Sequence, residues 1–194
     1  MKKIIISILI LCWGVAAFSQ VKSGTWNNAT ATYSNAKYGV TWTLIDGLEW
    51  VGRPILSDDT LLKVRNDDSH ILVTLGAVLV DAKGVDIWDF VSQYNTEEFI
   101  AAARELAKHN GMTLQYVKPI RSQLCGKHAV KIKTDMTKYH PEYDVTVHSV
   151  EYKYQVVSGN AFLTLTVTGL SVLESELEDF DLIVKILFDG VSIE

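Results

Sequence analysis

Alternating apolar and polar residues predict β-strands along most of the chain. Residues 71–80 form a largely apolar run rich in β-branched side chains, which favours a buried central strand. In residues 161–168, the odd-numbered positions are apolar and alternate with Phe162 and threonines at the even-numbered positions. This pattern is typical of a strand with one packed and one half-polar face. Cys125-Gly126 and Ser158-Gly159-Asn160 are typical hairpin turns. Further strands are expected at 31–33, 40–44, 61–65, 112–124, 127–134 and 144–157.

Two segments have apolar residues at helical spacing instead. The first has Asn95 as its expected N-cap and Glu98 three residues later, as in a capping box, and it stops at Asn110-Gly111. The second repeats the box with Ser175 and Glu178. Its expected apolar face consists of Leu177, Phe180, Ile183, Val184 and Leu187. Hairpin-connected strands with a helix inserted before and after them predict an α+β domain with an antiparallel sheet.

The strand at 144–157 changes its hydrophobic phase along its length. Val145 and Val147 are the apolar residues of the first part, whereas Val150 and Tyr152 are the bulky residues of the second part. Keeping both sets on the inner face requires one extra residue near His148-Ser149, which a β-bulge supplies. His148 is then expected to point outward together with Asp144, about 7 Å along the strand.

The first nineteen residues have the pattern of a secretory signal peptide. Lys2 and Lys3 precede an apolar run at 4–17, and Ala17-Phe18-Ser19 places small residues at the −3 and −1 positions of a cleavage site. The run is too short for a stable membrane anchor, and no later segment reaches the length of a span. We expect cleavage after residue 19, a mature chain of residues 20–194, and export to the periplasm or, alternatively, secretion.

Charge and cysteine content limit the possible partners and bonds of the mature chain. Removing Lys2 and Lys3 with the signal leaves 16 basic against 23 acidic residues, a net charge of −7. Nucleic-acid binding needs clustered basic residues, so a nucleic-acid partner is not expected. Cys125 is the one cysteine of the mature chain, which therefore has no internal disulfide. About 175 residues without a linker or repeat predict a single domain.

Both ends of the mature chain resemble PsbP-like and Mog-type domains. YSNAKYGVTWTLIDGLEW is similar to the family's opening, although Gly47-Leu48-Glu49-Trp50 replaces a simple Gly-Trp. SGNAFLTLTVTG followed by FDLIVKILF is similar to the family's closing hairpin and helix, although Phe188-Asp189 replaces the usual Ser-Phe. The order of elements agrees over essentially the whole mature chain. The resemblance implies an α/β/α sandwich with a central antiparallel sheet flanked by helices, and binding or assembly roles without catalysis.

Candidate metal ligands gather in the stretch KYHPEYDVTVH, residues 138–148. His140, Asp144 and His148 are residue types that bind metals when several of them converge on one point. His70 or His128 would have to complete such a site. The competing interpretation is a solvated hairpin loop that leads into a strand, and we favour it because such residues are commonly just exposed.

Other candidate features carry weaker signals. Cys125 and His128 could form a nucleophilic thiolate–imidazole pair, but no orienting Asn or Asp lies beside them, and a lone cysteine is more often a small buried hydrophobe. The acidic turns SDDT and NDDS lack the ligand alternation of a calcium loop. Asp59-Thr60-Leu61 resembles a glycosylation sequon of exported Bacteroidetes proteins. The sequence contains no phosphate loop, nucleophile elbow or zinc-binding helix motif.

The tryptophans complete the set of candidates. Trp42, Trp50 and Trp88 are expected to pack in the core, although they could line a ligand groove. Trp26 lies before the first expected strand, in a loosely docked arm or as a contact for a partner. The sequence therefore favours a non-enzymatic exported envelope protein, a binding or assembly factor without a cofactor. Its partner would be a protein segment or a small apolar ligand. The alternatives are a weak metal-binding or hydrolytic protein that uses the His140–His148 loop, and a structural or adhesion component of an envelope complex.

Overall fold

The computed structural model describes residues 24–52, 59–79, 86–92, 95–116, 119–172 and 176–194. The expected signal peptide at 1–19 and the predicted cap residue Ser175 lie outside these ranges. Within these ranges, no helix has the length and apolar character that a membrane span requires.

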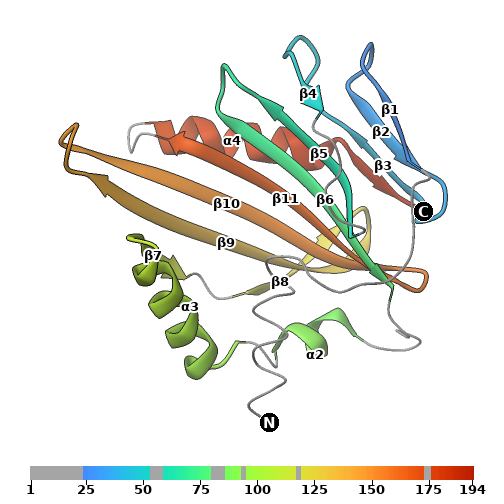
Figure 1. The fold of residues 1–194 in the computed structure, drawn as a ribbon. Coiled ribbons are helices and arrows are strands. Elements are labelled where there is room, and N and C mark those ends of the chain that lie inside the picture. Colours follow the sequence, from blue (N-terminus) through green and yellow to red (C-terminus); the bar gives the residue numbers. More distant parts are fainter. Residues whose placement is uncertain (1–23, 53–58, 80–85, 93–94, 117–118, 173–175) are drawn as a thin grey trace.

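An eight-stranded antiparallel sheet forms the larger part of the fold (Figure 1). Its strands follow the order β4-β5-β6-β11-β10-β9-β7, and β8 also pairs with β9. The bounds are β4 Val51–Gly52, β5 Thr60–Asn66, β6 Ile71–Leu79, β7 Thr113–Tyr116, β8 Ile120–Leu124, β9 Lys127–His140, β10 Val145–Ser158 and β11 Ala161–Val172. The predicted antiparallel sheet is confirmed. The single strand predicted at 112–124 is wrong, because β7 and β8 pair with different parts of β9.

A smaller sheet contains four antiparallel strands in the order β1-β2-β3-β12 (Figure 1). The bounds are β1 Thr25–Asn27, β2 Thr32–Asn35, β3 Val40–Thr43 and β12 Val191–Ile193. Trp26 lies within β1 and packs half-buried against the core, so the expected arm before the first strand is replaced by an edge strand. Three-residue strands such as β1 and β12 carry too little alternation to be recognised in the sequence.

In the described part of the chain, three helices cover parts of the larger sheet: α2 Ile87–Ser92, α3 Glu97–His109 and α4 Leu177–Asp189. α4 packs on one face through Phe180, Val184 and Leu187. α2 packs on the opposite face through Ile87 and Val91, and α3 lies beside β7 (Figure 1). The helical cover is therefore partial, and the predicted α/β/α sandwich is found only in part.

The main core lies between α4 and the larger sheet. The apolar residues of β11 are fully buried there, as the alternation predicted, namely Ala161, Leu163, Leu165 and Val167. Trp42 of β3 is also fully buried, and its indole Nε1–H donates to the Leu187 carbonyl at 2.8 Å. Because β3 belongs to the smaller sheet, both sheets and α4 share this core.

The predicted irregularity at His148-Ser149 is present, but the extra residue lies in the neighbouring strand. Ser149 pairs with Leu170 and His148 pairs with Val172, so Ser171 of β11 is the inserted residue. The register between β9 and β10 runs unbroken across the same point. β10 therefore keeps its phase, and His148 lies on the α4-covered face with Val150 rather than pointing outward. The prediction placed the bulge in β10 because it assumed that Val145 and Val147 must be buried.

The predicted start of the first helix is displaced by one residue. Thr96 is the N-cap of α3, and its hydroxyl accepts the Phe99 N–H at 3.2 Å. Asn95, the predicted cap, has its side-chain Oδ1 buried without a hydrogen bond in the described residues. The predicted stop at Asn110-Gly111 is confirmed, with Gly111 in the left-handed region at φ +71°.

Candidate functional site

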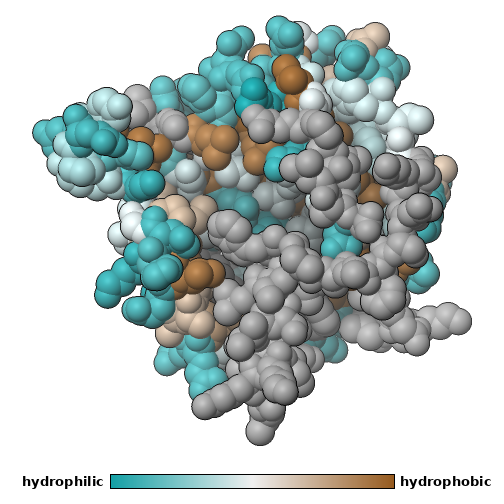
Figure 2. Space-filling model, in the orientation of Figure 1, coloured by the Kyte–Doolittle hydropathy of each residue, from teal (hydrophilic) through white to brown (hydrophobic). Residues whose placement is uncertain are grey.

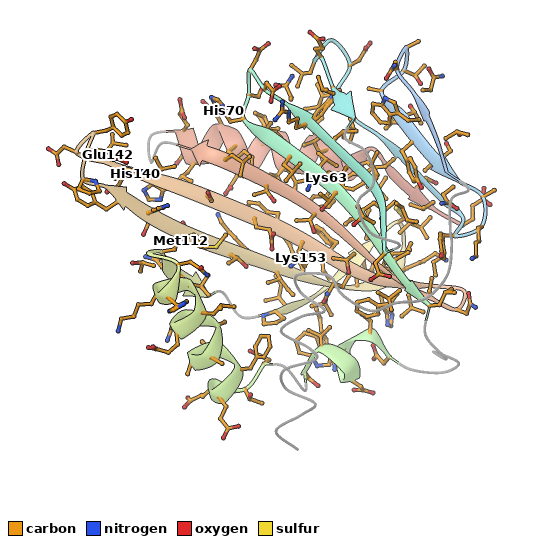
Figure 3. All side chains as sticks on the ribbon, in the orientation of Figure 1. Lys63, His70, Met112, His140, Glu142 and Lys153 are labelled. Carbon is orange, nitrogen blue, oxygen red and sulfur yellow. The ribbon has the colours of Figure 1, made fainter. Side chains whose placement is uncertain are left out.

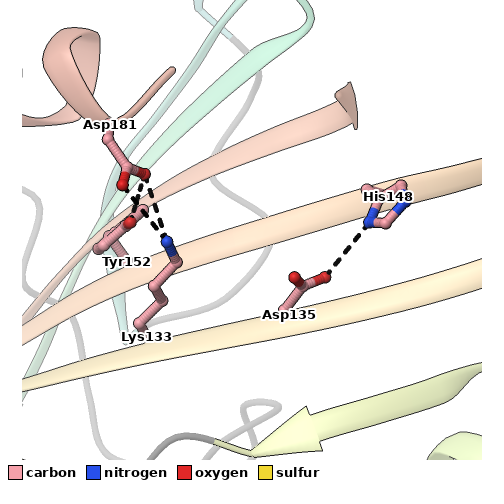
Figure 4. Close-up of polar contacts among 5 residues, drawn as sticks. All are labelled: Lys133, Asp135, His148, Tyr152 and Asp181. Carbon is pink, nitrogen blue, oxygen red and sulfur yellow. Dashed lines mark hydrogen bonds and ion pairs between the residues drawn. The ribbon is translucent and has the colours of Figure 1, made fainter. Parts of the chain in front are cut away.

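Ionisable side chains gather on the sheet face that α4 covers, in what we call the α4-side polar cluster. Its members are Lys133, Asp135, His148, Tyr152 and Asp181 (Figure 4). The first two lie on β9, the next two on β10 and Asp181 on α4. The register explains the arrangement, because Tyr152 pairs with Lys133 and Val150 pairs with Asp135, and directly paired residues share a face.

Tyr152 connects the sheet to α4. Its hydroxyl donates a hydrogen bond to Asp181 Oδ1, while Lys133 Nζ lies 3.4 Å from the same carboxylate. The Lys133 ammonium also lies 4.8 Å from the centre of the Tyr152 ring, within the range of a cation–π contact. One carboxylate on α4 thus binds one side chain from each of the neighbouring strands β9 and β10.

Burial and the Asp181 carboxylate together raise the pKa of Tyr152 well above its ordinary value. Desolvation is the larger cause, because the phenolate would lose its hydration beside the core, and Asp181 adds a hydrogen bond and a negative charge. Tyr152 is therefore a protonated donor at neutral pH and not a general base. The cluster has the chemistry of an anchor that fixes α4 on the sheet.

The second half of the cluster is a pair formed by His148 and Asp135. His148 Nδ1 lies 3.7 Å from Asp135 Oδ1, and both atoms are buried without a hydrogen bond in the described residues. The two side chains keep about a fifth of their surface exposed, 19% and 23% respectively. Within the described residues, no group of three or more His, Cys, Asp or Glu side chains could hold a metal ion.

Beyond the cluster, the hairpin of β9 and β10 projects past the rest of the sheet (Figures 1 and 2). The β7–β9 pairing ends at Thr113 and Thr137, and the β10–β11 pairing ends at His148 and Val172. β9 and β10 continue to pair with each other as far as His140 and Val145. We call residues 138–147 the arm.

The arm exposes aromatic and aliphatic side chains. Tyr143 in its turn is 77% exposed, Tyr139 on β9 is 55% exposed, and Val145 on β10 is 42% exposed. Tyr139 lies on the α4-covered face of the hairpin, because it pairs with Thr146, whereas Val145 lies on the opposite face. The arm therefore presents apolar surface on both faces and at its tip.

The structure does not bring the three candidate metal ligands together. His140 Nδ1 lies 3.9 Å from Glu142, and Asp144 accepts a hydrogen bond of 2.8 Å from the Tyr139 hydroxyl. His148 faces Asp135 instead, on the opposite face of the hairpin from His140. Figure 3 places His140 and Glu142 at the far end of the arm and His70 at the distant β5–β6 turn.

Cys125 does not have the surroundings of a nucleophile. It lies in the β8–β9 turn at φ +53°, and its thiol donates to the Val191 carbonyl at 3.0 Å. Partial burial raises its pKa, the opposite of what a reactive thiolate needs. The cysteine is exposed rather than a buried hydrophobe, because the turn lies at the surface. His128 is also exposed, near the start of β9.

The remaining candidates have structural surroundings. Trp50 is buried, and its Nε1–H donates to the Ile45 carbonyl, whereas Trp88 is only partly buried in the α2 cluster, 5.1 Å from the Arg121 guanidinium. The NDDS turn is held by Asn66, whose side chain accepts the Ser69 N–H at 2.7 Å. Part of SDDT lies outside the described residues.

Lys133, Tyr152 and Asp181 were not predicted as a group from the sequence. A register counted back from the 141–144 turn would have paired Tyr152 with Lys133, since both strands were predicted. The contribution of Asp181 follows only from how α4 crosses the sheet, and local patterns do not encode this crossing.

Comparisons with known proteins reveal the fold but not a sequence family. No family model matches the chain, and no curated protein is similar to it in sequence. The solution structure of cyanobacterial PsbP (CyanoP) from Synechocystis sp. PCC 6803 matches with a TM-score of 0.61 at 10% identity. The match covers 93% of this chain and 98% of CyanoP.

Two looser matches are also found. LpqN of Mycobacterium tuberculosis, involved in cell envelope biogenesis, has a TM-score of 0.43 at 13% identity and covers 79% of this chain and 82% of LpqN. The Ran-binding protein Mog1p of Saccharomyces cerevisiae has a TM-score of 0.43 at 10% identity and covers 81% of this chain and 92% of Mog1p. Of these three matches, the one to CyanoP is close enough to carry an argument about architecture. The chain has a PsbP-like fold.

Proposed function

We propose that this protein is a non-enzymatic, exported binding or assembly factor of the cell envelope, and that the arm contacts its partner. The observation that carries the proposal is the exposure of Tyr139, Tyr143 and Val145 on a hairpin that projects beyond the sheet. Tyrosines are enriched at protein interfaces because they offer a large contact area at a small cost in side-chain entropy.

The geometry of the arm favours a folded protein as the partner. Apolar side chains lie on both faces and at the tip, so a partner that touched one face would leave the other in water. A groove or a pair of loops that receives the arm would bury both faces. A paired hairpin is already ordered, so less conformational entropy is lost on binding than for a free peptide.

Two further observations support the proposal. The signal-peptide pattern of residues 1–19 supports export. The titratable groups beside α4 hold a protonated tyrosine against a carboxylate, an arrangement that serves packing rather than acid–base catalysis. A PsbP-like fold is compatible with an accessory role, although fold alone does not determine function.

Photo-crosslinking in intact cells tests the proposal. A photoreactive phenylalanine analogue replaces Tyr143 in one variant and Leu182, which is 59% exposed on the outer side of α4, in the control. We expect a discrete protein adduct from position 143 that position 182 does not give. The absence of an adduct from position 143, or the same adducts from both positions, would overturn the proposal. A lipid-only adduct would indicate a small apolar ligand instead.

A further inference from the structure

The face of the larger sheet opposite α4 carries hydroxyl and amine groups in the middle of the sheet. The strand registers place Lys63, Thr74, Thr166 and Lys153 in one row across β5, β6, β11 and β10. Directly paired residues share a face, and neighbouring strands lie about 4.8 Å apart, so the row is about 14 Å long. The two lysines that Figure 3 labels on this sheet, Lys63 and Lys153, lie at the ends of the row.

Thr166 in the centre of the row has an unused hydroxyl group. The residue is 6% exposed, and its hydroxyl makes no hydrogen bond within the described part of the chain. A buried hydroxyl without a hydrogen bond costs free energy, because it has lost its hydration. Thr74, directly opposite on β6, is half-buried and also makes no side-chain hydrogen bond with the described residues. Two neighbouring hydroxyl groups can therefore still donate.

Lys63 adds a positive charge to these hydroxyls. The other basic residues on this face are paired, since Arg65 Nε lies 2.7 Å from Asp67 Oδ1 and Lys153 Nζ lies 2.9 Å from Glu151 Oε1. Lys63 is half-buried and has no ion pair among the described residues. Its flexible four-carbon stem lets the ammonium group reach over its neighbour in the row. The row thus combines one uncompensated ammonium group with two hydroxyl donors.

These groups have the chemistry of a carboxylate site. Ammonium and hydroxyl groups both donate hydrogen bonds, and such bonds are strongest when the acceptor is charged. One uncompensated positive charge matches the single negative charge of a carboxylate. A phosphate monoester carries about −1.5 to −2 at neutral pH, and its additional charge would be repelled by Glu151 in the next row of the same face.

Apolar side chains border the row on two sides. Leu72 lies two residues before Thr74 on the same face of β6, about 7 Å along the strand. Ile132 of β9 pairs directly with Lys153. Both apolar side chains are partly buried, so they can contact a short hydrocarbon chain next to the row. The row and its borders therefore fit a carboxylate that is joined to a short apolar chain.

The row is separate from the helices on this face and from the arm. α2 packs beside β9 and β10, and α3 lies beside β7, whereas Lys63 and Thr74 belong to β5 and β6 at the other side of the sheet (Figure 1). The arm begins beyond His148, while the row crosses β10 at Lys153.

We propose that Lys63, Thr74 and Thr166 bind the carboxylate of a small monocarboxylic acid whose apolar chain contacts Leu72 and Ile132. Binding would neutralise the Lys63 ammonium and give both hydroxyls a charged acceptor. The site lies outside the arm, so it goes beyond the proposed function and does not depend on it.

Isothermal titration calorimetry of the mature chain tests the class of ligand, with hexanoate, 1-hexanol and inorganic phosphate as probes. We expect hexanoate to bind with a dissociation constant of about 1 mM or lower. Hexanol lacks the charge and phosphate lacks the chain, so each should bind at least about tenfold more weakly. No binding of hexanoate at about 10 mM, or equally tight binding of hexanol or phosphate, would overturn the proposal.

Substitutions test the residues. Lys63→Gln should weaken hexanoate binding about tenfold and Thr166→Val about fivefold, because each removes a hydrogen bond to a charged acceptor. Lys108→Gln, at an exposed lysine in the last turn of α3, is the matched control and should leave binding unchanged. Lys63→Arg keeps the charge and should keep binding, and melting curves check that all variants fold.

Equal weakening by Lys63→Gln and Lys108→Gln, or unchanged binding by a folded Thr166→Val variant, would overturn the site. A chain that crosslinks a protein through position 143 but does not bind hexanoate would overturn this site and leave the proposed function standing.

Discussion

At the scale of single residues, Tyr152 is the side chain on which the polar contacts of α4 depend. Its hydroxyl donates to Asp181, and its ring supports the Lys133 ammonium, which binds the same carboxylate. The ring itself is buried against Phe180 of α4, 6.2 Å between centroids. One residue thus joins apolar packing to the charged margin of the core.

Tyr152→Phe removes the hydroxyl and keeps the ring. We expect a loss of about 1–2 kcal/mol in the free energy of unfolding, because a hydrogen bond to a charged acceptor is lost beside the core. Tyr154→Phe is the matched control on the same strand face, and its ring packs edge-on against Phe188. Urea denaturation measures the stability of both variants. An equal loss from the two substitutions would contradict the claim that the hydrogen bond from Tyr152 to Asp181 stabilises the fold.

The same residue predicts a dependence on alkaline pH. The pKa of Tyr152 in the folded protein is raised above the ordinary value of 10.0, so the unfolded chain releases this proton first. The contribution of the protonated Tyr152 hydroxyl to the free energy of unfolding is fully present below about pH 10. It is lost as the pH rises through the folded-state pKa. From pH 9 to 11, wild type should therefore lose more stability than Tyr152→Phe. If the free energies of unfolding of wild type and Tyr152→Phe fall in parallel with pH, the Tyr152 hydroxyl is not held in its protonated form.

Zinc tests the alternative interpretation of the arm. His140, Asp144 and His148 each have a different neighbour, so we expect zinc to leave the melting temperature of the mature chain unchanged. Differential scanning fluorimetry with and without zinc measures this. A stabilisation that disappears in His148→Ala and persists in His70→Ala would restore the metal-site hypothesis.

At the scale of elements, the start of α3 shows how one hydrogen bond determines where a helix begins. Thr96→Ala should cost about 1 kcal/mol, because the Phe99 N–H loses its acceptor. Asn95→Ala is the control and should cost less than about 0.5 kcal/mol, because Asn95 Oδ1 makes no hydrogen bond in the described residues. Urea denaturation compares the two variants. A larger loss of stability for Asn95→Ala than for Thr96→Ala would show that Asn95 is the N-cap, as the sequence predicted.

The elements that the sequence predicted are those with strong periodicity. The alternation in β11 and the apolar stripe of α4 were sufficient to predict these two elements, because each buries a whole face in the core. Short strands such as β1 and β12 depend on pairing with distant segments, so local patterns did not predict them. The register shift was predicted at the correct position but in the wrong strand. The reason is physical, since Val145 and Val147 lie beyond the core and burial within one copy does not fix their phase.

The candidate site was harder to predict than the fold. His148 was recognised from its residue type, but Asp135 lies thirteen residues earlier on the paired strand and Asp181 lies on α4. Their proximity is set by the β9–β10 register and by the docking of the helix. The periodicity of the sequence gives neither the strand register nor the position of the helix. The candidate metal ligands were therefore predicted along one strand rather than across the sheet.

At the scale of the whole molecule, the fold divides into a packed body and a projecting arm. The body is the PsbP-like core of two sheets with α4, and it buries the large apolar residues of β6 and β11. The arm carries exposed tyrosines at its tip and on one face. We expect binding to depend on the arm and stability on the body, so substitutions in one should leave the other property unchanged.

The most direct test is the recovery from envelope extracts of the protein that crosslinks at position 143. Wild type, Tyr143→Ser and the control Leu182→Ser are compared in equal amounts, with melting temperatures measured to confirm folding. We expect about tenfold lower recovery with Tyr143→Ser, since an exposed aromatic anchor carries much of the affinity, and unchanged recovery with Leu182→Ser. Equal recovery by wild type and Tyr143→Ser would contradict the claim that the arm binds the partner.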